Sequence, residues 1–305
     1  MSSGESSGAI VAALGANLAI AASKVVGFLI TGSSSLAAEA VHSFADSGNH
    51  VLLLVGGKRA ERDADEQHPF GYGRDRYFYA FVVALVLFSL GSLFAVYEGI
   101  DKIRHPHPLD SPAVALGILV FAILAEGYSF RTAVRQARPL KGSSSWPDYV
   151  KRAKAPELPV VLLEDFAALI GLALALLGVG LTLATGQDVW DGIGTLSIGV
   201  LLGLVAIVLA VEMKALLIGE AAAPEAVRAI RGALVDGSTV LRVIHLKTLH
   251  LGPDELLVAA KIALDPALGL PEVARAIDAA EARVRAVEPL ARQMYLEPDL
   301  DRTPA

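Results

Sequence analysis

Two apolar runs, LALALLGVGLTLA at residues 172–184 and IGVLLGLVAIVLA at residues 198–210, carry no charged side chain. A helix needs about 20 mostly apolar residues to cross the roughly 30 Å hydrocarbon core of a bilayer. Both runs lie inside longer apolar segments that reach this length. They predict two membrane-spanning helices, and a content of 54% hydrophobic residues in the whole chain agrees with a membrane protein.

Four further segments of similar length precede these two runs, so the chain is predicted to cross the membrane six times. The predicted spans cover residues 8–31, 34–57, 77–99, 112–136, 158–184 and 190–217. Charged side chains are sparse in the spans and common after them. We therefore predict an α-helical membrane protein, with six transmembrane helices in a domain over residues 1–218 and a small soluble domain over residues 219–305.

Lysine and arginine are divided unevenly between the predicted loops. The loops after the second and fourth spans are rich in them, whereas the turns after the first and fifth spans have none. Cytoplasmic loops carry an excess of these residues, so we predict that both termini, and with them the C-terminal domain, are cytoplasmic. The start of the chain, MSSGESSG, lacks the basic region of a signal peptide. With no targeting segment evident, we expect a multi-pass protein of the plasma (inner) membrane.

Beyond the spans, two segments have a different character. Residues 141–159 are polar and contain prolines, which predicts a linker. From residue 224 onward, amphipathic segments alternate with strand-like ones in the order α-β-β-α-β. This order predicts a small α+β domain with its helices on one face of a short sheet. No catalytic motif occurs in it, and a dimerising or signal-binding role fits it.

Several classes of function are disfavoured by composition. The net charge of −6 gives no electrostatic support for binding nucleic acid. The chain has no cysteine, which excludes disulfides and thiolate metal sites. The HExxH motif of zinc proteases is absent, and no Ser/His or paired-Asp catalytic arrangement is evident. We therefore do not expect an enzyme.

The stretch EAVHSFADSGNH, residues 39–50, places ionisable side chains inside the second predicted span. Charged groups inside a bilayer are costly, so they should face the bundle interior and have a function. His42 and Asp46 are four residues apart and lie on one face of a helix, where an imidazole and a carboxylate can share one divalent ion. The alternative is that they only bond to neighbouring backbone.

A second acidic pair, Glu164 and Asp165, lies in VVLLEDFAALIG of the fifth predicted span. If this helix packs beside the second, the pair would join His42 and Asp46 as a set of four ligands. One nitrogen with several carboxylate oxygens suits Zn²⁺, and Mn²⁺, Fe²⁺ and Co²⁺ also accept such a set. Glu126 is a lone carboxylate in the fourth span that could relay protons or bind Arg131 or a helix end.

GSSSLAAEAVHSFADSGNH (residues 32–50) and HPFGYGRDRYFY (residues 68–79) together resemble the cation diffusion facilitators, in particular the branch that contains the mitochondrial zinc transporter nine of animals. The resemblance covers nearly the whole chain. It implies a homodimer that exports Zn²⁺ or a similar ion from the cytoplasm in exchange for protons. The ion would be the substrate rather than a cofactor, and its site would lie between the second and fifth spans.

On this resemblance, His42 and Asp46 match the ligand pair of the second span, and Asp165 matches the last ligand of the fifth. The other fifth-span ligand position is Val161, which cannot coordinate a metal, so we expect Glu164 to replace it. A more oxygen-rich site should discriminate less sharply against Mn²⁺ or Fe²⁺.

The resemblance also implies a second metal site in the loop after the second span. Asp65 and His68 occupy plausible positions there, but Tyr72 stands where many relatives have a histidine, so we expect this site to be weak or absent. In the C-terminal domain, Lys261 and Tyr295 stand at ligand positions and only Glu297 keeps ligand character, which favours dimerisation as the role of that domain. The rivals to zinc export are an exporter of Mn²⁺, Fe²⁺ or Co²⁺, and a metal-binding membrane scaffold without flux.

Overall fold

The computed structural model of the chain describes residues 3–300, with side chains from residue 17 onward except at positions 87 and 88. The chain divides into two compact units. The helical unit consists of Met1–Lys58 and Phe78–Lys214, and the tail unit consists of Arg59–Tyr77 and Ala215–Ala305. The segment that joins the second predicted span to the third therefore belongs to the same compact unit as the C-terminal residues.

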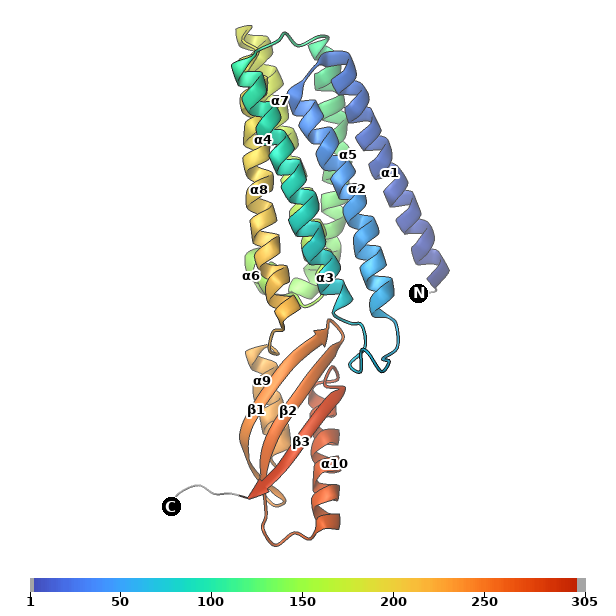
Figure 1. Cartoon of the computed structure of the whole chain (residues 1–305), viewed down its shortest axis with the longest axis vertical. Coiled ribbons are helices and arrows are strands. Elements are labelled where there is room, and N and C mark those ends of the chain that lie inside the picture. The colour runs from blue at the N-terminus through green and yellow to red at the C-terminus, as the bar shows by residue number, and fades with distance from the viewer. Residues whose placement is uncertain (1–2, 301–305) are drawn as a thin grey trace. The chain divides into compact units, whose positions relative to one another are not determined.

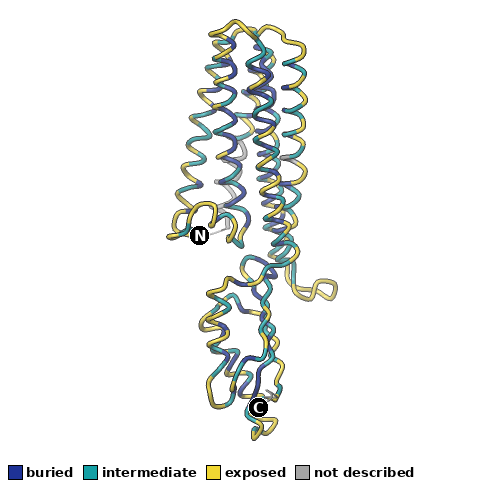
Figure 2. Tube along the Cα trace, turned by 90° about the vertical axis from the view of Figure 1, so that its left-hand side faces the viewer, coloured by how far each residue is buried: buried dark blue, intermediate teal, exposed yellow. Residues whose placement is uncertain are grey.

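Long helices make up the helical unit, and Figure 1 shows them packed side by side as a bundle. Their bounds are α1 Ser3–Thr31, α2 Ser34–Ala60, α3 Asp75–Val82, α4 Ser89–Arg104, α5 Pro112–Lys141, α7 Glu157–Thr185 and α8 Val189–Ile218. A π-helical turn, η1 at Val83–Phe88, joins α3 to α4. Each predicted span thus corresponds to one helix or, in the third, to the series α3, η1 and α4. Figure 2 shows buried and exposed positions alternating along these helices.

Four helical segments of the described chain are long and apolar enough to cross a membrane. They are Asp75–Arg104, Pro112–Lys141, Glu157–Thr185 and Val189–Ile218. Helix α2 does not meet this standard of hydropathy because polar and charged side chains interrupt it. The apolar stretch of α1 with described side chains is the shorter segment Asn17–Thr31. These four segments support a helical membrane domain. Their number is smaller than the six crossings predicted from the sequence, so six crossings are not established.

Small residues on α7 leave room for α2. The buried positions of α7 include Ala167, Ala168, Gly171, Ala175 and Gly178. Small residues repeated along one face allow helix backbones to approach closely in lipid. A Cβ atom built on Gly171 would lie 2.5 Å from Oε1 of Glu39 on α2. The α2–α7 contact therefore depends on the absence of a side chain at this position.

The N-terminus of α2 is held by Asp191, a wholly buried residue near the start of α8. Its carboxylate accepts hydrogen bonds from Ser33 Oγ at 2.9 Å, from the backbone nitrogen of Ser34 at 2.8 Å and from that of Ser35 at 3.4 Å. Backbone N–H groups at a helix start have no partner within the helix, and a negative charge there is favourable. The GSSS sequence thus fastens α2 to α8.

The polar segment at residues 141–159 is more ordered than the predicted linker. It contains a short helix, α6 at Trp146–Arg152, whose N-cap Ser145 accepts a hydrogen bond from the backbone nitrogen of Asp148 at 3.2 Å. Pro147 stands in the first turn, where its missing N–H costs nothing. Tyr149 is buried with Ala133 and Ala137 of α5. Pro147 thus lies in the first turn of α6 and begins the helix rather than breaking it.

The tail unit has the predicted order α-β-β-α-β. Its elements are α9 Pro224–Leu234, β1 Val240–Gly252, β2 Glu255–Leu264, α10 Leu270–Val287 and β3 Gln293–Leu300. The strands lie in the order β1-β2-β3, with β1 antiparallel and β3 parallel to β2. Both helices cover one face of the sheet (Figure 1), and buried side chains such as Ile230, Val258 and Val284 form the core between them.

Candidate metal-ion site

A stripe of polar residues runs along α2. Its members, which we call the α2 stripe, are Ser35, Glu39, His42, Asp46 and Asn49. They recur every three or four residues, so they share one face of the helix. All five are buried, and the most exposed, Asp46, has 8% of its surface accessible. Burial of so many polar groups is costly unless they have partners or a ligand.

His42 and Asp46 are at the centre of this stripe. Nδ1 of His42 lies 3.4 Å from Oδ1 of Asp46, a separation fixed by their positions one turn apart on the helix. Oδ1 of Asp46 accepts no hydrogen bond from any described residue. His50 extends the cluster, with Nδ1 2.7 Å from the carbonyl oxygen of Asp46. The structure therefore brings together the two ligands that the sequence predicted on this helix.

Glu164 of α7 faces the same cluster. Its Oε1 accepts a hydrogen bond from Nδ2 of Asn49 at 3.2 Å. Its carboxyl group and that of Asp46 lie close enough to share a proton in a hydrogen bond. Glu164, rather than the neighbouring Asp165, is thus the α7 residue drawn toward α2.

Asp165 is oriented toward α5. Its Oδ2 accepts a hydrogen bond from Ser129 Oγ at 2.9 Å. Glu126, one turn before Ser129, is half-buried and acts electrostatically on both Glu164 and Asp165. Among the residues with described side chains, no three His, Asp or Glu groups converge in a geometry that would hold a metal ion. The four predicted ligands are thus neighbours that do not yet share one point.

A cavity of about 680 Å³ adjoins this cluster inside the helical unit. Its lining residues come from α1, α2, α5 and α7 and include Asn17, His50, Ser129, Glu157 and Val161. Ser129 lines the cavity and also bonds to Asp165, so the cavity leads to the acidic pair. Val161 presents an apolar side chain at its wall.

The arrangement suits reversible binding of a divalent cation. It offers one imidazole and at least two buried carboxyl groups, of which Asp46 and Glu164 face each other. Nitrogen and oxygen donors of this kind bind Zn²⁺ and also first-row ions such as Mn²⁺ and Co²⁺.

The second predicted site, in the tail unit, has a different construction. Asp65 accepts a hydrogen bond from the Tyr72 hydroxyl at 2.6 Å and one from the backbone nitrogen of His68 at 2.7 Å. The Tyr72 hydrogen bond, together with the backbone bond from His68, lowers the pKa of Asp65 to about 2. His68 Nδ1 is 3.4 Å from Asp65 Oδ1, and all three side chains are exposed or half-exposed. The carboxylate of Asp65 thus stabilises a turn, and His68 is the other predicted metal ligand beside it.

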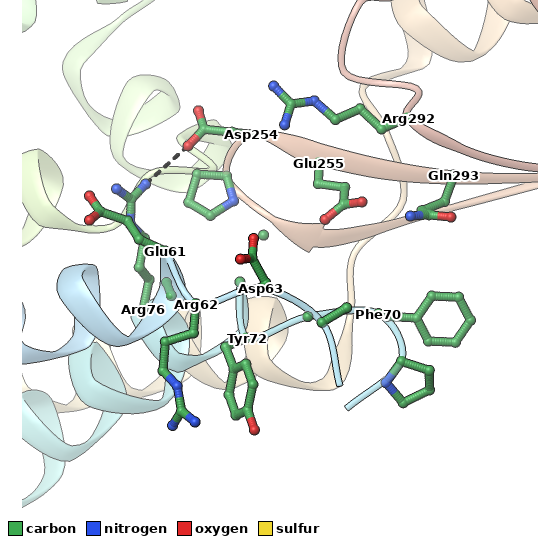
Figure 3. A pocket seen from close by; sticks show the side chains of 17 residues that line it. Glu61, Arg62, Asp63, Phe70, Tyr72, Arg76, Asp254, Glu255, Arg292 and Gln293 are labelled. Atoms are coloured by element: carbon green, nitrogen blue, oxygen red, sulfur yellow. Dashed lines mark hydrogen bonds and ion pairs between the residues drawn. The ribbon is translucent and has the colours of Figure 1, made fainter. Parts of the chain in front are cut away.

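This loop packs against the β1–β2 hairpin within the tail unit (Figure 3). A cavity of about 390 Å³ lies between them, and Arg76 pairs with Asp254 across it at 3.2 Å. Gly73 and Gly252 allow the close approach, because a Cβ atom on Gly73 would lie 2.9 Å from the carbonyl oxygen of Leu251. The HPFGYG sequence thus shapes a loop that docks on the hairpin.

In the sheet, Lys261 forms ion pairs with two carboxylates of β3. Its Nζ lies 2.9 Å from Glu297 Oε1 and 3.3 Å from Asp299 Oδ2. The hydrogen bonds to Glu297 and then Asp299 raise the pKa of Lys261. His245 is opposite Lys261 in the register of β1 and β2. An ammonium group therefore stands between these carboxylates.

Three polar residues that contribute to the site were missing from the predicted set. Asn49 and Ser129 hold the acidic pair of α7, and Lys24 of α1 binds Glu39. Asn49 continues the spacing of His42 and Asp46, so the periodicity of α2 contained the signal for it. No comparable pattern marks Ser129 or Lys24, because their partners lie on other helices.

Comparison with known proteins agrees with these features. A family model described as the cation efflux transmembrane domain matches residues 10–218, which is more than half of the chain. The chain is 33% identical over 246 residues to the "Proton-coupled zinc antiporter SLC30A9, mitochondrial" of Xenopus laevis, covering 79% of this chain and 44% of that protein. The human protein of the same name is 31% identical over 245 residues, covering 79% and 43%.

A plant protein also matches. Metal tolerance protein C4 of Arabidopsis thaliana is 30% identical over 258 residues, covering 83% of this chain and 56% of that protein. The chain thus spans only about half, or less, of the length of these curated relatives. The resemblance inferred from residues 32–50 and 68–79 is confirmed.

The expected location in the plasma (inner) membrane is wrong by the same comparison, because the animal relatives are named as mitochondrial proteins. The expectation rests on the lack of an evident targeting segment, which does not identify a membrane. The count of basic residues in the loops orients the helices and does not distinguish one membrane from another either. A multi-pass membrane protein remains supported.

Proposed function

We propose, because the chain belongs to the cation efflux family, that it exports a divalent cation, chiefly Zn²⁺, in exchange for protons. Members of this family are transporters rather than enzymes, and the metal ion is their substrate rather than a cofactor. Transport of a metal cation follows from membership. Zinc as the ion and protons as the counter-substrate are favoured by the names of the animal relatives.

The observation that carries this proposal is that the buried carboxyl groups of Asp46 and Glu164 face each other beside His42. Two carboxylates so close repel each other unless a proton or another cation lies between them. A divalent cation can replace that proton. We infer that His42, Asp46, Glu164 and Asp165 are the ligands, with Asp165 leaving Ser129 when the ion binds.

Proton exchange follows from the chemistry of this set. Metal ligands must be deprotonated, so an arriving cation displaces protons from His42 and from the carboxylates. After the helices have opened the site to the other side, protons return and expel the ion. In this scheme Glu126 of α5 relays protons to the cluster. Its partial burial and its electrostatic effect on Glu164 support this role.

This scheme includes six crossings, with α1 and α2 as spans whose polar residues face the bundle. It also includes a homodimer formed through the tail unit, with Asp65 and His68 as at most a weak additional metal site. The polar α2 stripe explains why α2 can span lipid in spite of its composition, because its polar side chains are buried in protein.

Flux into inverted vesicles tests the proposal. A pH gradient should drive Zn²⁺ uptake by the wild-type protein, and competition by Mn²⁺, Fe²⁺, Co²⁺ and Cd²⁺ should rank below Zn²⁺. Stronger competition by Mn²⁺ or Fe²⁺ would favour a different ion, as the oxygen-rich ligand set allows. Binding without pH-dependent flux would contradict transport and favour a metal-binding scaffold.

A further inference from the structure

A buried ion pair lies one turn from the candidate site. Nζ of Lys24 on α1 is 3.0 Å from Oε2 of Glu39 on α2 and 2.6 Å from the hydroxyl of Ser43. Lys24 and Glu39 are both wholly inaccessible to solvent. A lysine in a membrane helix commonly extends to the interface. Lys24 instead directs its charge into the protein.

Glu39 belongs to the same stripe as the proposed ligands. It precedes His42 by three residues, which is a rise of about 4.5 Å along the helix. Its Oε2 binds Lys24, whereas its Oε1 accepts no hydrogen bond from the described residues. Oε1 lies against Gly171 of α7, where a Cβ atom would come within 2.5 Å. Glu39 is thus a further buried carboxylate between α2 and α7.

The antiparallel pairing of α2 and α7 keeps Glu39 at the contact between the two helices. Asn49 bonds to Glu164, and Glu39 lies against Gly171 two turns further along α7. The polar groups of the α2 stripe therefore continue past the site toward the N-terminus of α2. In that direction, Glu39 is the next acidic residue after Asp46.

We propose that Lys24 is a resident counter-ion beside the site: its ammonium group pairs with Glu39 and keeps that carboxylate from becoming an additional ligand of the transported cation. This inference rests on the proposed function. Without Lys24, Glu39 would be an uncompensated buried charge, and a nearby divalent cation would satisfy it. The ion would then bind more tightly and leave more slowly. Lys24 is a positioning residue in this scheme, because it acts on the cation through Glu39.

Three variants of the full chain test the inference. Lys24→Met removes the charge, Lys24→Met with Glu39→Gln removes both charges, and Lys102→Met is the matched control. Lys102 is another buried lysine of the helical unit, but its ammonium binds His107 and a backbone carbonyl rather than a carboxylate. Binding of Zn²⁺ and of Co²⁺ is measured by calorimetry on the purified proteins, and uptake is measured in vesicles.

The inference predicts that Lys24→Met lowers the Kd for both ions about tenfold or more and reduces turnover. The double variant should return the Kd to near the wild-type value, and Lys102→Met should leave it unchanged. A Kd in Lys24→Met that is unchanged or higher would overturn the inference, as would tight binding that persists in the double variant. A purely structural role for Lys24 would not tighten binding.

If Lys24→Met does not fold, Lys24→Gln decides, because its amide can still bond to Glu39 and Ser43 but carries no charge. The Kd for Zn²⁺ should again fall about tenfold. An unchanged Kd would overturn the inference. Wild-type protein that neither binds nor moves Zn²⁺ would contradict the proposed function itself. Wild-type transport with no effect of these substitutions on affinity would contradict the inference alone.

Discussion

Carboxylates are used in opposite ways in the two units of this molecule. In the tail unit, Glu297 and Asp299 share one lysine, Lys261, and Asp254 pairs with Arg76. In the helical unit, the buried carboxyl groups of Asp46 and Glu164 face each other, and no lysine or arginine with a described side chain bonds to them. Carboxylates that are paired with a lysine or an arginine do not require a metal ion. Buried carboxylates without such a partner can be stabilised by one.

Glu39 lies between these two cases. One of its oxygens has a lysine partner and the other has no hydrogen bond from the described residues. The carboxylates of the tail unit have side chains as their neighbouring cations, whereas under the proposed function the cation beside Asp46 and Glu164 is the transported ion. Four substitutions break or sharpen this comparison, beginning with the largest expected effect.

Asp46→Ala should reduce pH-driven Zn²⁺ uptake by about 100-fold or more, because it removes a ligand and the partner of His42. Uptake in inverted vesicles is the measurement. The matched control is Glu297→Gln, a carboxylate of the tail unit that already has a lysine, and it should transport like the wild type. Normal uptake by Asp46→Ala would disprove the site.

Glu164→Gln should raise the Kd for Zn²⁺ about tenfold, which is the loss of one charged ligand from four. Calorimetry on the purified protein measures this. Asp101→Asn, a half-exposed carboxylate of α4 that pairs with His105, is the control and should bind as the wild type does. Unchanged affinity and ion preference in Glu164→Gln would make Glu164 a bystander and would leave the Val161 position without a substitute.

Asp191→Ala should lower stability without changing affinity for metal. It deprives Ser33, Ser34 and Ser35 of their common acceptor, at a cost of about 1–3 kcal/mol for buried donors. The midpoint of thermal unfolding in detergent should fall, while the Kd for Zn²⁺ in the folded protein stays the same. A weakened Kd at full stability would show that Asp191 acts on the metal site.

Lys261→Met should have the smallest effect, a local loosening of β2 and β3 with transport intact. The pKa of Lys261 is raised, chiefly by its hydrogen bond to Glu297, so its contribution to stability is complete below the ordinary lysine pKa of about 10.4 and is lost as the pH rises through the higher value. Limited proteolysis of the tail should distinguish variant from wild type at neutral pH and lose the difference at strongly alkaline pH. A difference that persists there would assign the effect to packing.

The helices and strands could be predicted because their signals are local. Apolar length marked the spans, and alternating patterns marked the tail. His42 and Asp46 were accessible for the same reason, since both lie on one helix at a spacing that the helix fixes. The polar residues of α2 also explain why α2 is not apolar enough to be identified as a membrane span by hydropathy, whereas α7 and α8 are.

Features that depend on contacts between helices could not be predicted. Asp165 turns to Ser129 of α5 while Glu164 turns to Asn49 of α2, and the sequence of α7 alone does not distinguish the two directions. The burial of Lys24 depends on Glu39 and Ser43 of another helix. Residues 141–159 were misjudged because a proline that interrupts a helix and one that begins a helix look alike without the cap of Ser145.

Anomalous X-ray diffraction at the zinc edge, on crystals of the full chain grown with Zn²⁺, tests the central claim most directly. The predicted result is a strong peak between α2 and α7, with His42 nitrogen and the oxygens of Asp46 and the α7 carboxylates at about 2.0–2.2 Å. A peak confined to the tail unit, at Asp65 and His68 or beside His245, would contradict the claim. So would zinc-loaded crystals with no peak near His42.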